Sequence, residues 1–396
     1  MYQYVHGQFS AFCSRQWQVL GFAVLSLLAS PVVAGTVEHH TLPDALAYVA
    51  GHLPSGISQD KPLAFSALIE ELTPNRVVFV GEVHDRYDHH LHQLALLQAL
   101  HQRNPNIAIG VEWFQQPFQP VLNDFLAGNI SEAEMLQRSE YFDRWRYDYR
   151  LLRPIMEYAK ANRLPVIALN APVELTRKVS GGGLEALSPG ERAQLPPEIN
   201  PPDHGYKARL QQIFTQHSKD ASQFDNFLLV QRIWDETMAH NVMRYLKAHP
   251  QHQMLVFSGS GHISFNAGIP HDVQQQMPGI RLATVVSTDP QDIQSGMVDY
   301  FLLTRMLELP RTGKLGVWLK SAEAGGVQIG TLQEKSAAKR AGLRAGDRIT
   351  RLNDVAIGSM ADLMQGLSRH KPGEQVSVLV ERVGMQEPLK YDVTLQ

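Results

Sequence analysis

Cysteine is almost absent from this chain of 396 residues, and that absence limits the chemistry available to the protein. The single cysteine, Cys13, lies before an apolar run at Val19–Ala34. If that run is removed as a signal, the mature chain has no disulfide, no thiolate nucleophile and no cysteine-bound metal. Histidine, carboxylate, tyrosine or methionine side chains would then have to hold any metal or haem.

The chain also lacks an excess of basic residues. Its 36 lysines and arginines are outnumbered by 39 aspartates and glutamates, which leaves a formal net charge of −3. A surface that binds the phosphates of nucleic acid needs a basic excess, so we predict no nucleic-acid partner. Histidine is abundant by contrast, with 17 residues, many of them in short clusters.

Residues 1–34 have the pattern of a secretion signal. Arg15 supplies positive charge, and the apolar run that follows ends in small residues at Ala34. The run is shorter than the roughly 20 apolar residues that a membrane span needs, and Pro31 interrupts its end. We therefore expect a cleaved signal and a periplasmic protein. An uncleaved anchor, which would leave the protein membrane-associated, is the alternative.

Short apolar runs alternate with helical patterns between Arg76 and Ser287. Each run is apolar throughout, as expected for strands buried on both faces of a parallel sheet. The predicted strands are Val77–Val80, Ile107–Val111, Val166–Leu169, Met254–Phe257 and Leu282–Val286. We predict an α/β domain over residues 35–309, with a mostly parallel sheet flanked by helices. A stretch rich in glycine and proline at Ser180–Tyr206 is either a binding loop or lid, or a disordered insertion.

The pattern changes after Leu309, and Glu308–Thr312 is the expected linker. The following β-like runs are Gly316–Leu319, Val327–Thr331, Arg348–Leu352 and Val376–Val380, with a helical segment near Met360–Leu367. They predict a small α+β domain at residues 312–396.

Polar side chains follow four of the predicted strands. They are Glu82, His84, Glu112, Asn170 and His262. The carboxyl ends of parallel strands meet at one edge of a sheet, where open α/β sheets bind ligands. The two glutamates and two histidines can bind a divalent cation, or share protons as general acid and base. A buried hydrogen-bonded network that only orients loops is the third interpretation.

Two further clusters contain candidate ligands. His89 and His92, on the first predicted helix, either reach the site or lie solvated on the helix surface. In Tyr141–Tyr149, aromatic residues alternate with arginines, an arrangement that can stack on a flat macrocycle and hold its acidic substituents. The alternative is a helix start whose aromatic rings pack into the core. Asp235, on a long predicted helix, is a minority candidate for the edge of the pocket.

Five segments, taken in order, resemble the ChaN family of haem-binding uptake proteins within the Tiki-like superfamily. They are FVGEVHD at Phe79–Asp85, GVEWF at Gly110–Phe114, RWRYDYRLLRPIMEYAKANRLPVIALNAP at Arg144–Pro172, WDETMA at Trp234–Ala239 and GSGHI at Gly259–Ile263. The resemblance implies an α/β fold that binds haem, with homodimerisation as one way to complete the pocket. Members often carry a lipid-attachment cysteine, which this chain lacks at the corresponding place.

The resemblance also implies particular ligands. In this family a tyrosine is implicated in binding the iron, and its best match here is Tyr149, with Tyr147 in reserve. Basic side chains or histidines hold the haem propionates. The matching residues are Arg144, Arg146, His84 and His262.

The same superfamily includes metal-dependent hydrolases and proteases. For that alternative function, the catalytic and metal-binding residues would be Glu82, His84, Glu112 and His262. A divalent metal would then replace haem as the cofactor.

Residues Lys314–Gln396 resemble a PDZ domain, whose partner would be the C-terminus of a peptide or protein. The expected carboxylate-binding loop contains Leu315, Gly316 and Val317. A bound peptide would add as a strand to the sheet edge. Gly342 and Gly346 match turn positions that other residues resist. A structural module without a ligand is the alternative.

Overall fold

The computed structural model describes residues 35–36, 41–58, 61–217, 221–322 and 326–396. The expected signal at 1–34 lies outside these residues. The chain forms two compact units: one contains the chain up to Ala127 together with Asp148–Leu309, and the other contains Gly128–Tyr147 and Pro310–Gln396. Across the described ranges, no helix is both long and apolar enough to cross a membrane.

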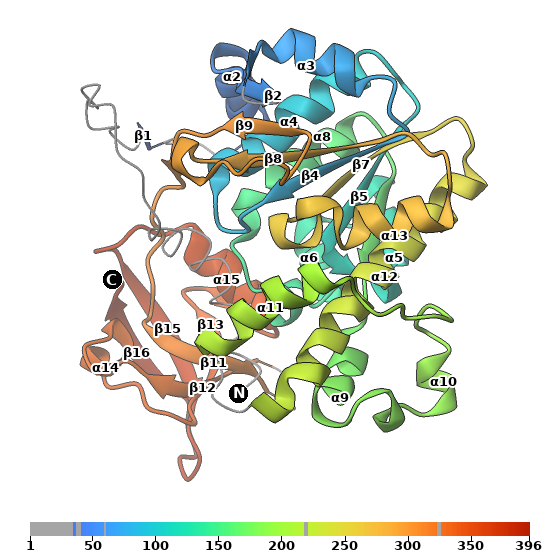
Figure 1. Cartoon of the computed structure of the whole chain (residues 1–396). Coiled ribbons are helices and arrows are strands. Elements are labelled where there is room, and N and C mark those ends of the chain that lie inside the picture. Colours follow the sequence, from blue (N-terminus) through green and yellow to red (C-terminus); the bar gives the residue numbers. More distant parts are fainter. Residues whose placement is uncertain (1–34, 37–40, 59–60, 218–220, 323–325) are drawn as a thin grey trace. The chain divides into compact units, whose positions relative to one another are not determined.

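The first unit is built on an eight-stranded sheet with the order β3-β2-β9-β8-β4-β7-β5-β6 (Figure 1). The strands are β2 (Ser55–Ser58), β3 (Lys61–Leu63), β4 (Val77–Glu82), β5 (Ile107–Gln115), β6 (Val166–Asn170), β7 (Gln253–Gly259), β8 (Leu282–Thr288) and β9 (Tyr300–Leu303). The neighbours from β9 to β6 are parallel, whereas β2 pairs antiparallel with both β3 and β9. The five predicted strands and the mostly parallel α/β fold are confirmed.

Strand order determines which strand ends become neighbours. β7 enters the sheet late in the chain but lies between β4 and β5, pairing with both. In the register of β4 with β7, Glu82 lies opposite Gly259. The strand ends that carry the polar residues therefore lie at one edge of the sheet.

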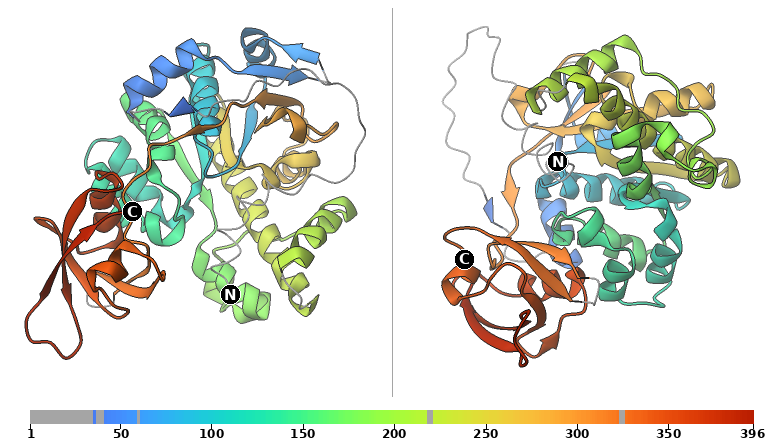
Figure 2. Two further views of the ribbon diagram at one scale, coloured as in Figure 1. Left: turned by 90° about the vertical axis from the view of Figure 1, so that its left-hand side faces the viewer. Right: turned by 90° about the horizontal axis from the view of Figure 1, so that it is seen from below.

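Helices cover both faces of this sheet (Figures 1 and 2). One layer contains α2 (Leu42–Gly51), α3 (Phe65–Leu72), α4 (Tyr87–His101) and α8 (Arg153–Ala161), and the other contains α9 (Val173–Gly182), α12 (Phe224–Ala248) and α13 (Ile269–Gln276). α4 lies between the sheet and helices α2, α3 and α8 and is buried on almost every side. The expectation of solvated histidines on this helix is therefore wrong, because both His89 and His92 are buried.

The stretch at Ser180–Tyr206 is folded. It includes the end of α9, the short helix α10 (Pro189–Arg192) and the start of α11 (His204–His217). Leu187 and Leu195 pack into the apolar core of the unit. The stretch is therefore not a disordered insertion.

The second unit contains an antiparallel sheet with the order β11-β12-β13-β15-β16. Its elements are β11 (Val317–Ser321), β12 (Val327–Leu332), α14 (Ala337–Ala341), β13 (Arg348–Leu352), β14 (Val355–Ala356), α15 (Met360–Ser368), β15 (Gln375–Glu381) and β16 (Leu389–Thr394). Gly342 and Gly346 adopt φ angles of 96° and 90°, in the left-handed region that favours glycine. This is the small PDZ fold that the sequence predicted.

A segment from earlier in the chain completes this unit. Gly128–Tyr147 carries α6 (Glu132–Arg138) and α7 (Tyr141–Arg144), and both helices contact α15. Phe142 packs against the apolar core of the PDZ unit. The insertion therefore contributes apolar contacts to a domain that lies far along the chain.

We predict that Phe142→Ala destabilises the PDZ unit by about 1–3 kcal/mol, because it removes apolar contacts from a partly buried site. Hydrogen exchange of backbone amides in β12, β13 and β15 measures the loss. Phe227→Ala is the matched control, since Phe227 is also partly buried but packs in the first unit. Equal protection of the PDZ amides in both variants would contradict the prediction.

Candidate functional site

Four of the predicted polar residues gather at the carboxyl edge of the parallel sheet. Glu82 ends β4 and His84 follows it, while Glu112 lies in β5 and His262 lies just after β7. All four are largely or fully shielded from solvent, and the two glutamates are 2% and 3% exposed. The structure thus places together the residues that the strand pattern predicted to meet.

Glu82 is the most heavily bonded carboxylate of this cluster. It receives hydrogen bonds from Gln93 Nε2 at 2.6 Å and Trp113 Nε1 at 3.0 Å. The Nδ1 atoms of His84 and His90 each lie 3.0 Å from its oxygens. Burial alone would raise the pKa of Glu82, but the neighbouring His90 and His84 hold it below its ordinary value. Glu82 is therefore a fixed negative charge that orients two imidazoles.

Glu112 joins the other half of the cluster. Its Oε2 accepts a hydrogen bond from the Gly259 amide at 2.7 Å, and its Oε1 lies 3.6 Å from His262 Nε2. A methyl group on Gly259 would lie 2.9 Å from Cε1 of His84 and 3.7 Å from Glu112 Oε2. His84 and Glu112 therefore surround a position that has room only for glycine.

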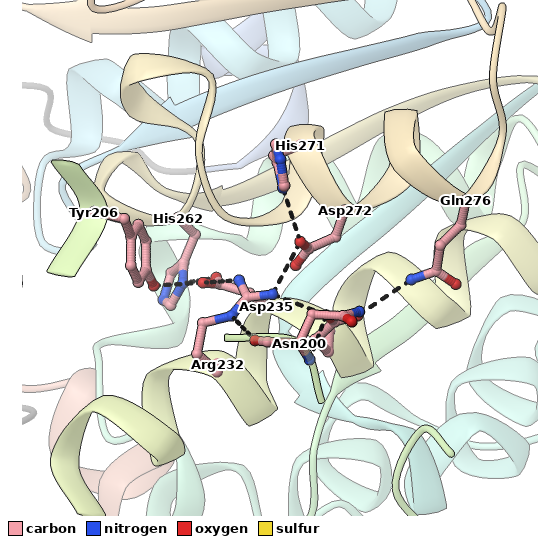
Figure 3. Close-up of polar contacts among 9 residues, drawn as sticks. Asn200, Tyr206, Arg232, Asp235, His262, His271, Asp272 and Gln276 are labelled. Atoms are coloured by element: carbon pink, nitrogen blue, oxygen red, sulfur yellow. Dashed lines mark hydrogen bonds and ion pairs between the residues drawn. The ribbon is translucent and has the colours of Figure 1, made fainter. Parts of the chain in front are cut away.

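The buried carboxylate of Asp235, on α12, orients the His262 ring through its Nδ1 atom (Figure 3). Asp235 Oδ1 lies 2.6 Å from His262 Nδ1, and Asp235 Oδ2 accepts a hydrogen bond of 2.5 Å from the Tyr206 hydroxyl. Although burial works against a charged imidazole, Glu112 and Asp235 raise the pKa of His262 to about 9. His262 is consequently a cation at neutral pH.

Arg232 anchors this arrangement one turn earlier on α12. Its guanidinium lies 2.8 Å from Glu236, 2.9 Å from Asp272 and 3.5 Å from Asp235. Its Nε donates to the backbone carbonyl of Asn200 at 2.9 Å. These buried charges hold α12, α13 and the stretch before α11 against one another, which fixes the position of Asp235 (Figure 3).

The other residues that the sequence singled out either contact the backbone next to the cluster or lie apart from it. Asn170 ends β6 and donates to the backbone carbonyl of Glu112 at 3.1 Å. His89 accepts a hydrogen bond from the Val83 amide through Nδ1 at 3.0 Å. His92 lies 3.1 Å from Ser287 Oγ and has no contact with the glutamates of the cluster. His89 and His92 therefore make structural contacts of α4 and are not members of the cluster.

The aromatic and arginine cluster is divided between the two units. Residues up to Tyr147 belong to the insertion of the PDZ unit, whereas Tyr149 begins a short 3-10 helix of the first unit. Arg144 pairs with Glu140 at 2.7 Å, and Arg146 donates to a backbone carbonyl in its own turn. The Tyr149 side chain is 2% exposed, with the Arg153 guanidinium 5.8 Å from its ring centre.

The predicted carboxylate-binding loop leads into an edge strand. Gly316 has a φ of 72°, and a Cβ there would lie 2.6 Å from Ser336 Cβ. Leu315 is buried, and Val317 begins β11, which pairs only with β12 among the strands that the structure describes. The other side of β11 therefore offers backbone groups to an added strand.

No group of three or more histidine, cysteine, aspartate or glutamate side chains is placed to hold a metal ion anywhere in the described part of the chain. The divalent-metal alternative therefore has no support here.

Several residues of the site were not predicted from the sequence. They are His90, Gln93, Trp113, Asn200, Tyr206, Arg232 and Asp272. The spacing of Arg232 and Glu236, four residues apart on one helix, is a signal for an ion pair. Tyr206 has no such signal, because it reaches Asp235 from a part of the chain 29 residues away.

Two family models match different parts of the chain. The model of the family described as haem-binding uptake, Tiki superfamily, ChaN matches residues 68–273, and the PDZ domain model matches residues 313–393. A solved structure of ChaN of Campylobacter jejuni, with cofacially bound haem, is 18% identical and covers 63% of this chain and 96% of its own, with a TM-score of 0.49.

Two curated relatives each match part of the chain. Protein RETICULATA-RELATED 5 of Arabidopsis thaliana, a chloroplastic protein, is 23% identical over 60% of this chain and 34% of its own length. The serine protease Do-like HtrA of Lactococcus lactis is 39% identical over 17% of this chain and 16% of its own. The chain thus spans about a third and about a sixth of these two proteins.

The raised pKa of His262 predicts a pH-dependent stability. The charged imidazole stabilises the fold fully below pH 6.5, its unfolded pKa, and this contribution is lost as the pH rises through about 9. We expect the free energy of unfolding to fall by up to about 3 kcal/mol over that interval. Denaturant titrations across this range measure it. Asp235→Asn should flatten the dependence, whereas Asp225→Asn, at an exposed position on the same helix, should leave it unchanged.

The close packing around Gly259 predicts that alanine is tolerated much less well there than at the nearby Gly261. Gly259→Ala should displace His84, because the added methyl lies 2.9 Å from its ring, while Gly261→Ala meets nothing within 4 Å. We expect the first variant to lose about 1–3 kcal/mol of stability and to shift the His84 ring resonances in NMR spectra. Identical spectra for the two variants would show that the cluster is looser than this geometry requires.

Proposed function

The chain belongs to the ChaN family of haem-binding uptake proteins in the Tiki superfamily and carries a PDZ domain, and from this premise we propose that its α/β unit binds haem in an exported uptake role. Export would follow cleavage of residues 1–34, leaving a periplasmic protein. The observation that carries the proposal is Tyr149, a tyrosine in the matched region whose ring lies beside the Arg153 cation.

The chain offers ligands of the kinds that haem requires. Bound haem would supply an iron that takes a ligand from the protein, and a tyrosinate is an established ligand of ferric haem. Tyr149 is the first candidate, with Tyr147 in reserve. The candidates for the propionates are Arg144, Arg146, His84 and His262. Of these, His262 is held as a cation by Glu112 and Asp235, which suits an anionic partner.

Binding through Tyr149 needs a local opening. Because its side chain is 2% exposed, a planar macrocycle reaches the hydroxyl only after surrounding residues move. A homodimer that completes the pocket is compatible with such a movement. We therefore propose that haem binding is accompanied by rearrangement around Tyr149–Leu151 of the first unit.

The PDZ domain would connect this binding unit to a protein partner. A peptide C-terminus would meet the loop at Leu315, Gly316 and Val317 and extend along the free side of β11. The exposed Trp318 lies on that strand and offers apolar surface to a ligand. The partner would be a protein that is exported with this chain or anchored in a neighbouring membrane.

A second candidate function is hydrolysis by acid–base chemistry without a metal. The observation that favours it is the Asp235–His262 pair at 2.6 Å, because a carboxylate that orients an imidazole is a recurring part of general acid–base sites. Glu82, His84 and Glu112 would complete the proton-sharing set. Loss of esterase activity in His262→Ala, with a chain that still folds, would support this alternative.

We expect the purified full chain to bind hemin in a saturable manner, with a shifted Soret band. Tyr149→Phe keeps the ring packing and removes the hydroxyl, so it should shift or abolish that band. Tyr245→Phe is the matched control and should leave the spectrum unchanged, because Tyr245 lies on α12 and its hydroxyl is 2.8 Å from His252 Nδ1. Elemental analysis of the isolated protein accompanies the titration.

Glu82→Ala should have the smaller effect on the hemin spectrum, because Glu82 orients histidines and is not expected to contact iron. Absence of saturable hemin binding by the wild-type chain would refute the proposal. A hemin spectrum that Tyr149→Phe leaves intact would refute this ligand assignment alone.

A further inference from the structure

Three carboxylates share a single guanidinium where α12 packs against α13 (Figure 3). Arg232 lies 2.8 Å from Glu236 and 2.9 Å from Asp272, and Asp235 lies 3.5 Å from the same group. All four side chains are 5% exposed or less. His262, a cation paired with Asp235, is the second positive charge of this group. If all three carboxyls were ionised, three negative charges would therefore face two positive ones in a buried place.

Asp272 differs from the other two carboxylates in how its oxygens are bonded. Asp235 and Glu236 each have polar partners on both oxygens. Asp272 uses only Oδ1, towards Arg232 and His271, while its buried Oδ2 has no hydrogen-bond partner in the part of the chain that the structure describes. Asp272 is consequently the carboxyl whose negative charge is least stabilised, and a proton on it removes the excess charge.

Titratable groups face Asp272 from α11, from α12 and from its own helix. They are Tyr206 on α11, Arg232, Asp235 and Glu236 on α12, and His271 on α13. Burial raises the pKa of Asp272 to about 6, with Asp235 and Glu236 adding to the rise and Arg232 opposing it. His271 is 41% exposed and its Nδ1 lies 3.2 Å from Asp272, so the carboxyl has a polar connection to solvent.

Asp272 is joined to His262 through the start of α13 as well as through Arg232. The Asp272 amide donates to the carbonyl of Gly268, the residue before α13, at 3.1 Å. Gly268 has a φ of 63°, and a Cβ there would overlap the carbonyl oxygen of His262 and lie 3.2 Å from Asp235 Oδ1. A shift of this turn therefore acts directly on the His262–Asp235 pair.

We propose that Asp272 is a positioning residue for His262 and that it acts in a proton-dependent way. With its proton, Asp272 is neutral, and Arg232 is shared by Asp235 and Glu236. Without it, the Asp272 carboxylate draws the guanidinium towards α13, so Asp235 loses a competing cation and holds His262 more strongly. The only bond made or broken is the carboxyl O–H, whose proton comes from solvent. This role does not depend on which ligand the α/β unit binds.

The first test follows the ring resonances of His262 in NMR spectra of the full chain between pH 4 and pH 10. The wild type should show two steps, near pH 6 from Asp272 and near pH 9 from the ring itself. Asp272→Asn keeps the shape of the side chain and cannot ionise, so the step near pH 6 should disappear. The remaining step should move to lower pH, because Arg232 then stays close to Asp235 and competes for its charge.

Asp225→Asn, the same substitution at an exposed position on α12, is the control and should keep both steps at the wild-type pH. A step near pH 6 that survives in Asp272→Asn would overturn the proposal, and so would a remaining step that stays at its wild-type pH. Absence of the step near pH 6 from the wild type would overturn it as well, and this measurement does not depend on the folding of any variant.

Stability provides an independent measurement. Because folding raises the pKa of Asp272 above its ordinary value of 3.8, its proton stabilises the fold fully below that pH, and this contribution is lost as the pH rises through about 6. Over this interval, the unfolding equilibrium constant of the wild type should rise by up to about a hundredfold relative to that of Asp272→Asn. Denaturant titrations of both chains measure the ratio, and a ratio that does not change with pH would contradict the proposal.

Discussion

Charges buried at the carboxyl edge of the parallel sheet are the constraint on which the α/β unit depends. Glu82, Glu112, Asp235 and Arg232 are each 4% exposed or less. A buried charge without partners costs several kcal/mol, so each of these groups must be met by opposite charges or hydrogen-bond donors. That requirement joins β4, β5, α12 and the segment after β7, because no one element carries all the partners. The site is therefore rigid for the same reason that the unit holds together.

The buried charges also shift the pKa values of the histidines in opposite directions, depending on which charge lies nearby. His84 and His262 face carboxylates, which raise their pKa against the effect of burial. His89 and His92 are buried near Arg86, so both burial and charge lower their pKa. His90 lies on the same helix as His89 and His92, but it contacts Glu82, which raises its pKa. The neighbouring charge, and not the element that carries the histidine, therefore decides the direction of each shift.

The strands and the PDZ domain were predictable because their signals are local. Continuous apolar runs such as Val77–Val80 can be recognised without knowing their partners, and parallel strand ends must meet at one edge. Glu82, His84, Glu112 and His262 can therefore be grouped from the strand pattern alone. The burial of α4 could not be predicted in this way, since its histidines face neighbouring helices that the helix's own pattern does not specify.

The order of the strands along the chain, the two domain types and the polar residues that end each strand can be read from the sequence alone. The position of β7 between β4 and β5, the contact of Tyr206 with Asp235 and the completion of the PDZ unit by Gly128–Tyr147 depend on the folded structure. The difference arises from the range of the interactions. Periodicity and turn chemistry act over a few residues, whereas the pairing of buried charges and the filling of a core join residues that the chain separates widely.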